Sequence, residues 1–114
     1  MSRDNASLLD IFKAGQQALQ FARELTREQL ELDDLRQSAI LYQIVIIGEA
    51  TKRLSREFRS QHPRIPWKRI AGLRDILIHQ YDYVDIDVIW AVIQQEIPEL
   101  LAMIAPLLPE EPTE

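Results

Sequence analysis

Three residues whose side chains can do chemistry lie within eight positions of one another: Arg74, His79 and Tyr81, in the spacing R-x-x-x-x-H-x-Y. A histidine with an unperturbed pKa near ~6.5 can transfer protons at neutral pH. An arginine presents a planar, permanently charged fork that binds phosphate and stabilises charge developing on phosphorus. RNA supplies its own nucleophile, the 2′-hydroxyl. The hypothesis is therefore RNA cleavage to a 2′,3′-cyclic phosphate without a metal ion or a protein nucleophile.

A purely structural explanation competes with this hypothesis. A lone histidine near a helix end often only hydrogen-bonds a carbonyl group, and Arg74 next to Asp75 can form a surface ion pair. On these residues alone, structural roles are the more frequent outcome, because so short a pattern also arises by chance. His62, beside Pro63, is expected to be a solvent-facing loop residue.

No cofactor or metal site is expected from the sequence. Gly48-Glu49-Ala50-Thr51-Lys52 lacks the glycine spacing and the preceding strand of a phosphate-binding loop. Two histidines 17 positions apart and no cysteine do not make a zinc site. Trp67 and Trp90 are interpreted as core anchors rather than as platforms for stacking bases.

Helix geometry places a condition on the Arg74–His79 pair. Five positions on one straight helix point two side chains roughly 140° apart, so both cannot face one small target. Either the helix ends near His79 and frees that side chain, or a two-fold axis brings the residues of two chains together.

The composition indicates a single domain of 114 residues without disulfides, in a reducing compartment. The N-terminus lacks the apolar segment of a signal peptide, and no apolar run approaches the ~20 residues of a membrane span. We therefore expect a cytoplasmic protein with no membrane contact. The net charge of −5 argues against nonspecific nucleic-acid binding.

The basic residues are unevenly distributed, however. Eight of the thirteen lie between positions 52 and 74, with only Glu57 opposing them. They are Lys52, Arg53, Arg56, Arg59, Arg64, Lys68, Arg69 and Arg74. Such a cluster could attract phosphate locally, although a solvated helix face explains it equally well.

The apolar periodicity predicts helices throughout. The predicted elements are a first helix over 4–25, a short helical turn over 26–32, a long helix from Asp33 through Phe58, a third from Pro66 to Ile78 or His79, and a last one from Asp85. A polar turn is predicted over 82–85, and Pro98 must kink or restart the last helix.

These elements predict an all-α, antiparallel bundle of four main helices plus the short helical turn. The domain is expected to span residues 1–108, and residues 109–114 to form a flexible, acidic, Pro-rich tail. The run Ile40–Ile47 is apolar nearly all round, so several neighbours must cover it. A second subunit and a central position in the bundle both explain that pattern.

The chain resembles the HEPN superfamily and, within it, the HepT-like toxins that pair with minimal nucleotidyltransferase (MntA-like) antitoxins. The resemblance rests on Arg74-Asp75-Ile76-Leu77-Ile78-His79-Gln80-Tyr81. It is reinforced by Ile47-Gly48-Glu49-Ala50, by Ile65-Pro66-Trp67 leading into Ile70-Ala71-Gly72-Leu73, and by Val84-Asp85-Ile86 with Trp90 after it. It extends from about Leu8 to Leu108.

The resemblance implies a HEPN-like homodimer with the motif in a cleft at the interface. Arg74 and His79 would cleave RNA, Asp75 would orient or assist, and Tyr81 would be the residue to which the nucleotidyltransferase antitoxin transfers AMP, silencing the toxin. An AMP group beside His79 would occupy the RNA site and neutralise Arg74.

The sequence is compatible with three functions. The first is a metal-independent endoribonuclease toxin. The second is a non-catalytic helical partner that regulates a nucleotidyltransferase and carries the AMP acceptor. The third is a plain dimeric helical module.

Overall fold

The structure is a computed structural model that describes residues 2–80 and 83–109. The α-helices are α1 (Arg3–Phe21), α2 (Arg27–Glu31), α3 (Asp34–Arg53), α4 (Arg56–Gln61), α5 (Trp67–Ala71), α6 (Leu73–Leu77), α7 (Ile86–Ala91) and α8 (Ile97–Ile104). A π-helical segment, η1 (Val92–Glu96), joins α7 to α8, and a 3₁₀ turn, η2 (Ala105–Leu107), follows. The strands β1 (Ile78–Gln80) and β2 (Tyr83–Val84) form one short antiparallel hairpin. The predicted helical class is confirmed, with this hairpin as an addition.

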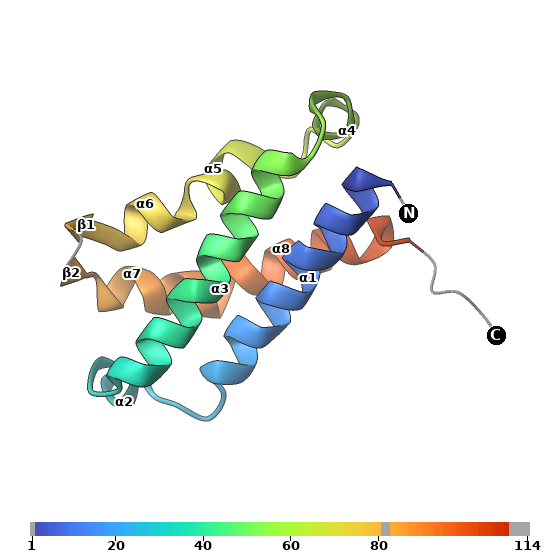
Figure 1. The fold of residues 1–114 in the computed structure, drawn as a ribbon. Helices are drawn as coiled ribbons and strands as arrows, with labels where there is room; N and C mark the ends of the chain where they lie inside the picture. The colour runs from blue at the N-terminus through green and yellow to red at the C-terminus, as the bar shows by residue number, and fades with distance from the viewer. Residues whose placement is uncertain (1, 81–82, 110–114) are drawn as a thin grey trace.

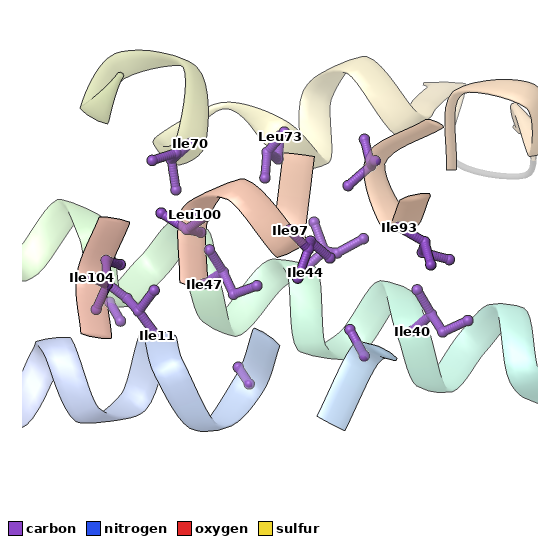
Figure 2. Packing of buried hydrophobic residues seen from close by; sticks show 14 of the residues in the cluster. Ile11, Ile40, Ile44, Ile47, Ile70, Leu73, Ile93, Ile97, Leu100 and Ile104 are labelled. Atoms are coloured by element: carbon purple, nitrogen blue, oxygen red, sulfur yellow. The ribbon is translucent and has the colours of Figure 1, made fainter. Parts of the chain in front are cut away.

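The long helices α1 and α3 lie side by side and antiparallel, α7–α8 crosses behind them, and α5–α6 lies against α3 (Figure 1). The core lies where these elements meet. Figure 2 shows Ile44 and Ile47 of α3 close to Ile97 and Leu100 of α8, with Ile11 of α1 beneath. All five side chains are at most 2% exposed. The apolar seams predicted for these helices therefore face one common core.

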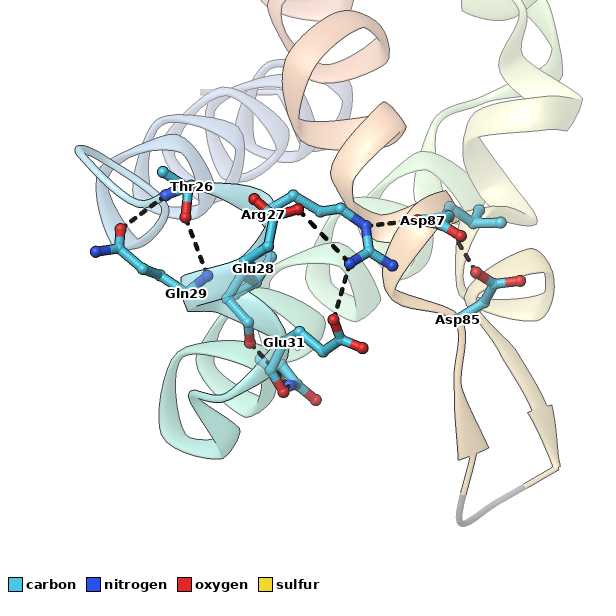
Figure 3. Close-up of polar contacts among 10 residues, drawn as sticks. Thr26, Arg27, Glu28, Gln29, Glu31, Asp85 and Asp87 are labelled. Carbon is cyan, nitrogen blue, oxygen red and sulfur yellow. Dashed lines mark hydrogen bonds and ion pairs between the residues drawn. The ribbon is translucent and has the colours of Figure 1, made fainter.

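The N-terminal helix ends earlier than the sequence predicts. Phe21 is its last residue, and Glu24 then adopts φ = 65°, a left-handed conformation that ends a helix. The short helical turn is confirmed as α2, which starts with a capping box: the Thr26 hydroxyl accepts from the Gln29 amide, and the Gln29 side chain accepts from the Thr26 amide. Figure 3 shows this box and the ion pairs of Arg27, which reach Glu31 at 2.8 Å and Asp87 of α7 at 2.6 Å.

The prediction of one continuous helix from Asp33 through Phe58 is wrong, because the structure divides this stretch into α3 and α4. Leu54 is extended (φ −63°, ψ 139°), and Ser55 caps the separate helix α4 by accepting from the Phe58 amide. Asp4 of α1 accepts hydrogen bonds from the Ser55 backbone amide (2.7 Å) and hydroxyl (2.8 Å). The break is thus held by a residue 51 positions away, which helical periodicity could not reveal.

The third predicted helix is also divided, into α5 and α6, at Gly72. Pro66 stands at the N-cap rather than at the first helical position, and α6 ends at Leu77. Within the polar turn predicted over 82–85, Tyr83 and Val84 form strand β2 instead, with Val84 opposite Ile78, and Asp82 lies outside the described residues. The Leu77 carbonyl accepts from the Asp85 amide at 3.1 Å, which closes the hairpin at its base.

The last helix agrees with the sequence prediction at Asp85, where it starts, and at Pro98. Asp85 caps α7 by accepting from the Val88 amide at 3.2 Å. The π-helical turn over Val92–Glu96 ends two residues before Pro98, whose ring and missing N–H prevent regular hydrogen bonding with the turn before it. Pro98 therefore distorts the helix without ending it.

The expectation that no apolar run approaches the length of a membrane span is wrong. The helical stretch Ile86–Leu107 has 22 residues and is long and apolar enough to cross a membrane by length and composition. A single helix of this kind is weak evidence for a span, because core helices of soluble proteins meet the same criterion. Its side chains at 89, 92, 93, 97, 100 and 104 are at most 3% exposed in the protein core.

Candidate active site

Arg74 lies on α6, a helix of five residues that starts after the break at Gly72. Its side chain is 57% exposed, and its one ion pair within the described residues is a loose contact of 3.7 Å from Nη1 to Oδ1 of Asp75. Asp75 itself is 77% exposed. Exposed pairs of this kind contribute little to stability. The guanidinium group therefore remains available to an external anion.

The Arg74 side chain borders a surface hollow of about 220 Å³ between α3 and α5–α6. The α3 side is formed by Val45, Gly48, Glu49 and Lys52, and the facing side by Ala71, Arg74 and Asp75. The sequence motif around Arg74 and the Ile47–Ala50 motif, some 25 positions apart, thus form one surface. We refer to this surface as the Arg74 hollow.

Gly48 allows the two sides of the Arg74 hollow to approach. A Cβ at this position would lie 3.1 Å from the Ala71 carbonyl oxygen, closer than ordinary van der Waals contact. Because the opposing atom belongs to the backbone, it cannot rotate away. A Cβ at Gly72 would meet nothing closer than 3.5 Å, and this glycine marks the helix break instead.

Among the described residues, the charges around the Arg74 hollow are balanced. Lys52 pairs with Glu49 at 3.3 Å, and Arg74 pairs with Asp75 at 3.7 Å, so two cations face two carboxylates. All four side chains are more than half exposed. Arg74 and Lys52 can both turn toward a phosphate group, at the cost of loosening weak ion pairs. Sequence reasoning did not identify Glu49 and Lys52 as site residues, since only the packing of α3 on α5 brings them to Arg74.

The structure meets one of the two geometric conditions on Arg74 and His79. Helix α6 ends at Leu77, Ile78 is extended (φ −118°, ψ 106°), and His79 belongs to strand β1. The two residues are therefore not on one straight helix, and the 140° separation does not apply. The His79 side chain and the whole of Tyr81 lie outside the described residues, so their predicted roles stay predictions.

The other histidine and the tryptophans have structural roles. His62 is half-buried rather than solvent-facing, and its ring packs on Phe58 with centroids 4.7 Å apart. Trp67 is 8% exposed, and its indole N–H donates to the carbonyl oxygens of Arg59 (3.2 Å) and His62 (3.0 Å). It anchors α4 to α5, as predicted for a core residue, whereas Trp90 is only half-buried.

The basic cluster does not act as one patch. Arg69 does not line the Arg74 hollow but donates to both carboxylate oxygens of Glu96, at 2.7 and 2.9 Å. These hydrogen bonds and the charge of Glu96 raise the pKa of Arg69 above its ordinary value. Arg64 borders a different cavity, with Met103 and Leu107. Only part of the cluster is therefore available near Arg74.

Comparison with known proteins identifies the family of this chain. The model of the family described as "Ribonuclease HepT-like" matches residues 11–107, which include the Arg74–Tyr81 motif. The chain belongs to this family. The resemblance seen in the sequence is therefore confirmed.

Individual relatives agree with the family match. A protein of Thermococcus cleftensis named a probable ribonuclease HepT is 39% identical over 101 residues, which cover 88% of this chain and 92% of that protein. A protein of Caldanaerobacter subterraneus subsp. tengcongensis named as a candidate RNase is 44% identical over 84 residues, covering 74% of this chain and 75% of that protein. No solved structure matches the chain significantly.

Proposed function

We propose that this HepT-like protein is a metal-independent endoribonuclease that uses Arg74 and His79. The imidazole of His79 takes the proton of a ribose 2′-hydroxyl, and the 2′-oxygen attacks the adjacent phosphorus. A P–O bond to the 5′-oxygen breaks, that oxygen takes up a proton, and a 2′,3′-cyclic phosphate remains. Arg74 neutralises the charge that develops on the phosphorane, and Asp75 orients the Arg74 side chain.

The observation that carries this proposal is the end of α6 at Leu77. It places an exposed arginine on a helix beside a hollow, while the histidine five positions later belongs to an extended strand. The family and the names of the relatives support RNA as the substrate. Cleavage of the phosphodiester through its own 2′-hydroxyl needs no metal.

The working unit of the proposed enzyme is a homodimer formed along α3. Leu35 and Tyr42 are 78% and 65% exposed, and they lie one heptad apart on the helix face that leads to Val45 and the Arg74 hollow. Exposed apolar side chains that continue into a functional hollow favour a second copy as their cover. A two-fold axis there would bring two Arg74 hollows together. A Leu35→Asp/Tyr42→Asp variant should elute as a monomer in size-exclusion chromatography with light scattering, and an unchanged mass would reject this interface.

The proposed biological context is a cytoplasmic toxin–antitoxin pair with an MntA-like nucleotidyltransferase. The Tyr81 phenol oxygen attacks the α-phosphate of ATP, pyrophosphate leaves, and the AMP group blocks the RNA site beside His79. This part rests on the resemblance, because Tyr81 lies outside the described residues. After co-expression with the nucleotidyltransferase, mass spectrometry should find AMP on the wild type and none on Tyr81→Phe.

A single assay separates the enzyme from the alternative, a non-catalytic partner of the nucleotidyltransferase. Purified protein is incubated with single-stranded RNA in the presence of EDTA, and the products are tested for 2′,3′-cyclic phosphate ends. If the protein is a ribonuclease, the wild type should cleave the RNA and His79→Ala should not. Absence of cleavage by unmodified wild type, together with AMP on Tyr81, would favour the alternative.

A further inference from the structure

A second hollow adjoins the Arg74 hollow and differs from it in charge. It is formed by Arg56, Arg59 and Ser60 of α4 together with Trp67, Lys68 and Ala71 of α5. Ala71 also borders the Arg74 hollow, so the two hollows share a wall. Figure 1 shows α4, α5 and α6 following one another along one edge of the molecule. We call this second surface the α4–α5 hollow.

Of the described residues that line the α4–α5 hollow, three are cations and none is a carboxylate. Among the described residues, Arg56, Arg59 and Lys68 form no ion pair, in contrast to Lys52, Arg69 and Arg74, each of which contacts a carboxylate. The Nε of Arg59 is buried and has no hydrogen-bond acceptor within the described part of the chain. Uncompensated cations gathered in a hollow raise the local concentration of anions.

The packing beneath this hollow holds the cations in place. Trp67 forms part of the hollow, and its indole N–H donates to the Arg59 carbonyl, which fixes the end of α4 against the start of α5. The Phe58 ring lies 6.0 Å from the Trp67 ring and supports it from α4. Arg59 and Lys68 therefore project from a braced junction rather than from a free loop. Because Trp67 is only 8% exposed, it supplies rigidity and not a stacking surface for bases.

We propose that the α4–α5 hollow binds backbone phosphates of single-stranded RNA, next to the nucleotide held at Arg74. This proposal rests on the proposed ribonuclease function and adds the path of the substrate. Single-stranded RNA is the form that fits, since in-line attack by a 2′-hydroxyl requires a backbone free of duplex geometry. The hollow offers mainly positive charge, so it contributes affinity and positioning more than sequence preference.

The adjacent residues Lys68 and Arg69 provide a matched test. Arg56→Gln/Lys68→Gln removes two cations from the α4–α5 hollow, and Arg69→Gln/Lys13→Gln removes two cations outside both hollows. The probe is a short 2′-O-methyl oligonucleotide, which lacks the nucleophile and reports binding without cleavage. Affinity is measured by fluorescence anisotropy from about 50 to 200 mM salt, and cleavage of ordinary RNA is measured in parallel.

The proposal expects a smaller salt dependence in Arg56→Gln/Lys68→Gln only. Loss of two phosphate contacts lowers the slope of log affinity against log salt by about 1.4, so across this range the wild type should lose about sevenfold more affinity than the variant. KM for RNA should rise while kcat stays near the wild-type value. The Arg69→Gln/Lys13→Gln control should behave as wild type.

The two proposals fail in different ways. If the wild type cleaves RNA and Arg56→Gln/Lys68→Gln keeps the wild-type KM and salt slope, the α4–α5 hollow is not a phosphate site and the ribonuclease stands. If the oligonucleotide binds through these cations but ordinary RNA is not cleaved, the ribonuclease proposal fails. If the slope of log affinity against log salt falls equally in both double variants, the RNA is attracted by overall charge. That result would also reject the α4–α5 hollow as a phosphate site.

Discussion

The α1–α3 pair and the α5–α6 arm occupy the same domain but are stabilised in different ways. The pair consists of helices of 19 and 20 residues, each with an N-cap side chain that accepts a backbone hydrogen bond. The helices α5 and α6 have five residues each, and neither has a side-chain cap. Isolated helices of that length are not stable in water.

The arm therefore depends on tertiary contacts for its position. Trp67, Ile70, Leu73 and Leu77 are at most 8% exposed, and they attach the arm to the core. The candidate catalytic residues lie on this arm and on the hairpin that follows it. Changes in the pair should consequently reduce stability first, whereas changes in the arm should reduce activity first.

The largest loss of stability is expected for Ile44→Ala in the pair. This side chain is fully buried between α3 and α8, so its truncation should cost about 2–5 kcal/mol of unfolding free energy. Arg74→Ala in the arm should change that free energy by less than about 0.5 kcal/mol, because its ion pair is exposed. Urea denaturation followed by circular dichroism measures both. Similar costs for the two variants would remove the distinction between pair and arm.

A smaller loss is expected for Gly48→Val, which acts on the contact between the two regions. The added side chain meets the backbone carbonyl of Ala71, and such overpacking costs about 1–3 kcal/mol. Gly15→Ala is the comparison: its Cβ would meet the end of the Leu101 side chain, which can rotate away. The Gly48 variant should also lose RNA cleavage in a nuclease assay at a temperature where it is folded. Full activity in a folded Gly48→Val would show that the spacing of α3 and α5 does not matter.

Trp67→Phe should loosen the α4–α5 junction with a modest effect on stability. It removes the indole N–H that donates to the carbonyls of Arg59 and His62, at a cost of about 1–2 kcal/mol. Hydrogen exchange should accelerate at α4 amides while α1 and α3 amides keep their protection. Uniform acceleration across the domain would mean that the arm and the pair open together.

The smallest effect is a pH dependence at the junction of α1 and α4. Hydrogen bonds from the Ser55 backbone amide and hydroxyl lower the pKa of Asp4 below its ordinary 3.8. Folding therefore favours the ionised carboxylate, so this contribution is complete above pH ~5 and is lost as the pH falls through the lowered pKa. Because Asp4 lies near the surface, the contribution should not exceed about 1 kcal/mol.

Thermal unfolding of the wild type and Asp4→Asn between about pH 3 and 7 measures this contribution. The melting temperatures should differ most at neutral pH and converge in acid. A constant difference across the whole range would contradict the assignment to Asp4.

The sequence predicted the features that local rules control. The short helical turn after Thr26, the start of the last helix at Asp85 and the disturbance before Pro98 all depend on residues within one or two turns. The break after Arg53 was missed because the apolar seam continues through Phe58, while the contacts that hold Ser55 come from Asp4. The hairpin was missed because the pairing of Ile78 with Val84 depends on chain reversal rather than on composition.

For the candidate site, the sequence identified Arg74 but not its surroundings. Glu49 and Lys52 are ordinary surface residues of a helix until Gly48 brings α3 against Ala71. Likewise, Lys68 and Arg69 look equivalent in sequence, yet one lines the α4–α5 hollow and the other pairs with Glu96. Such distinctions depend on which face of a short helix is covered, and that is set by tertiary packing.

The central claim is that an exposed arginine on the arm and a histidine just beyond it cleave RNA together. The direct test measures cleavage of single-stranded RNA in EDTA by the wild type, Arg74→Ala, His79→Ala and the control Arg64→Ala, with folding verified by circular dichroism. We expect Arg74→Ala and His79→Ala to lose at least about 10²-fold in rate, and Arg64→Ala to cleave as the wild type does. Wild-type rates in both folded site variants would contradict the account.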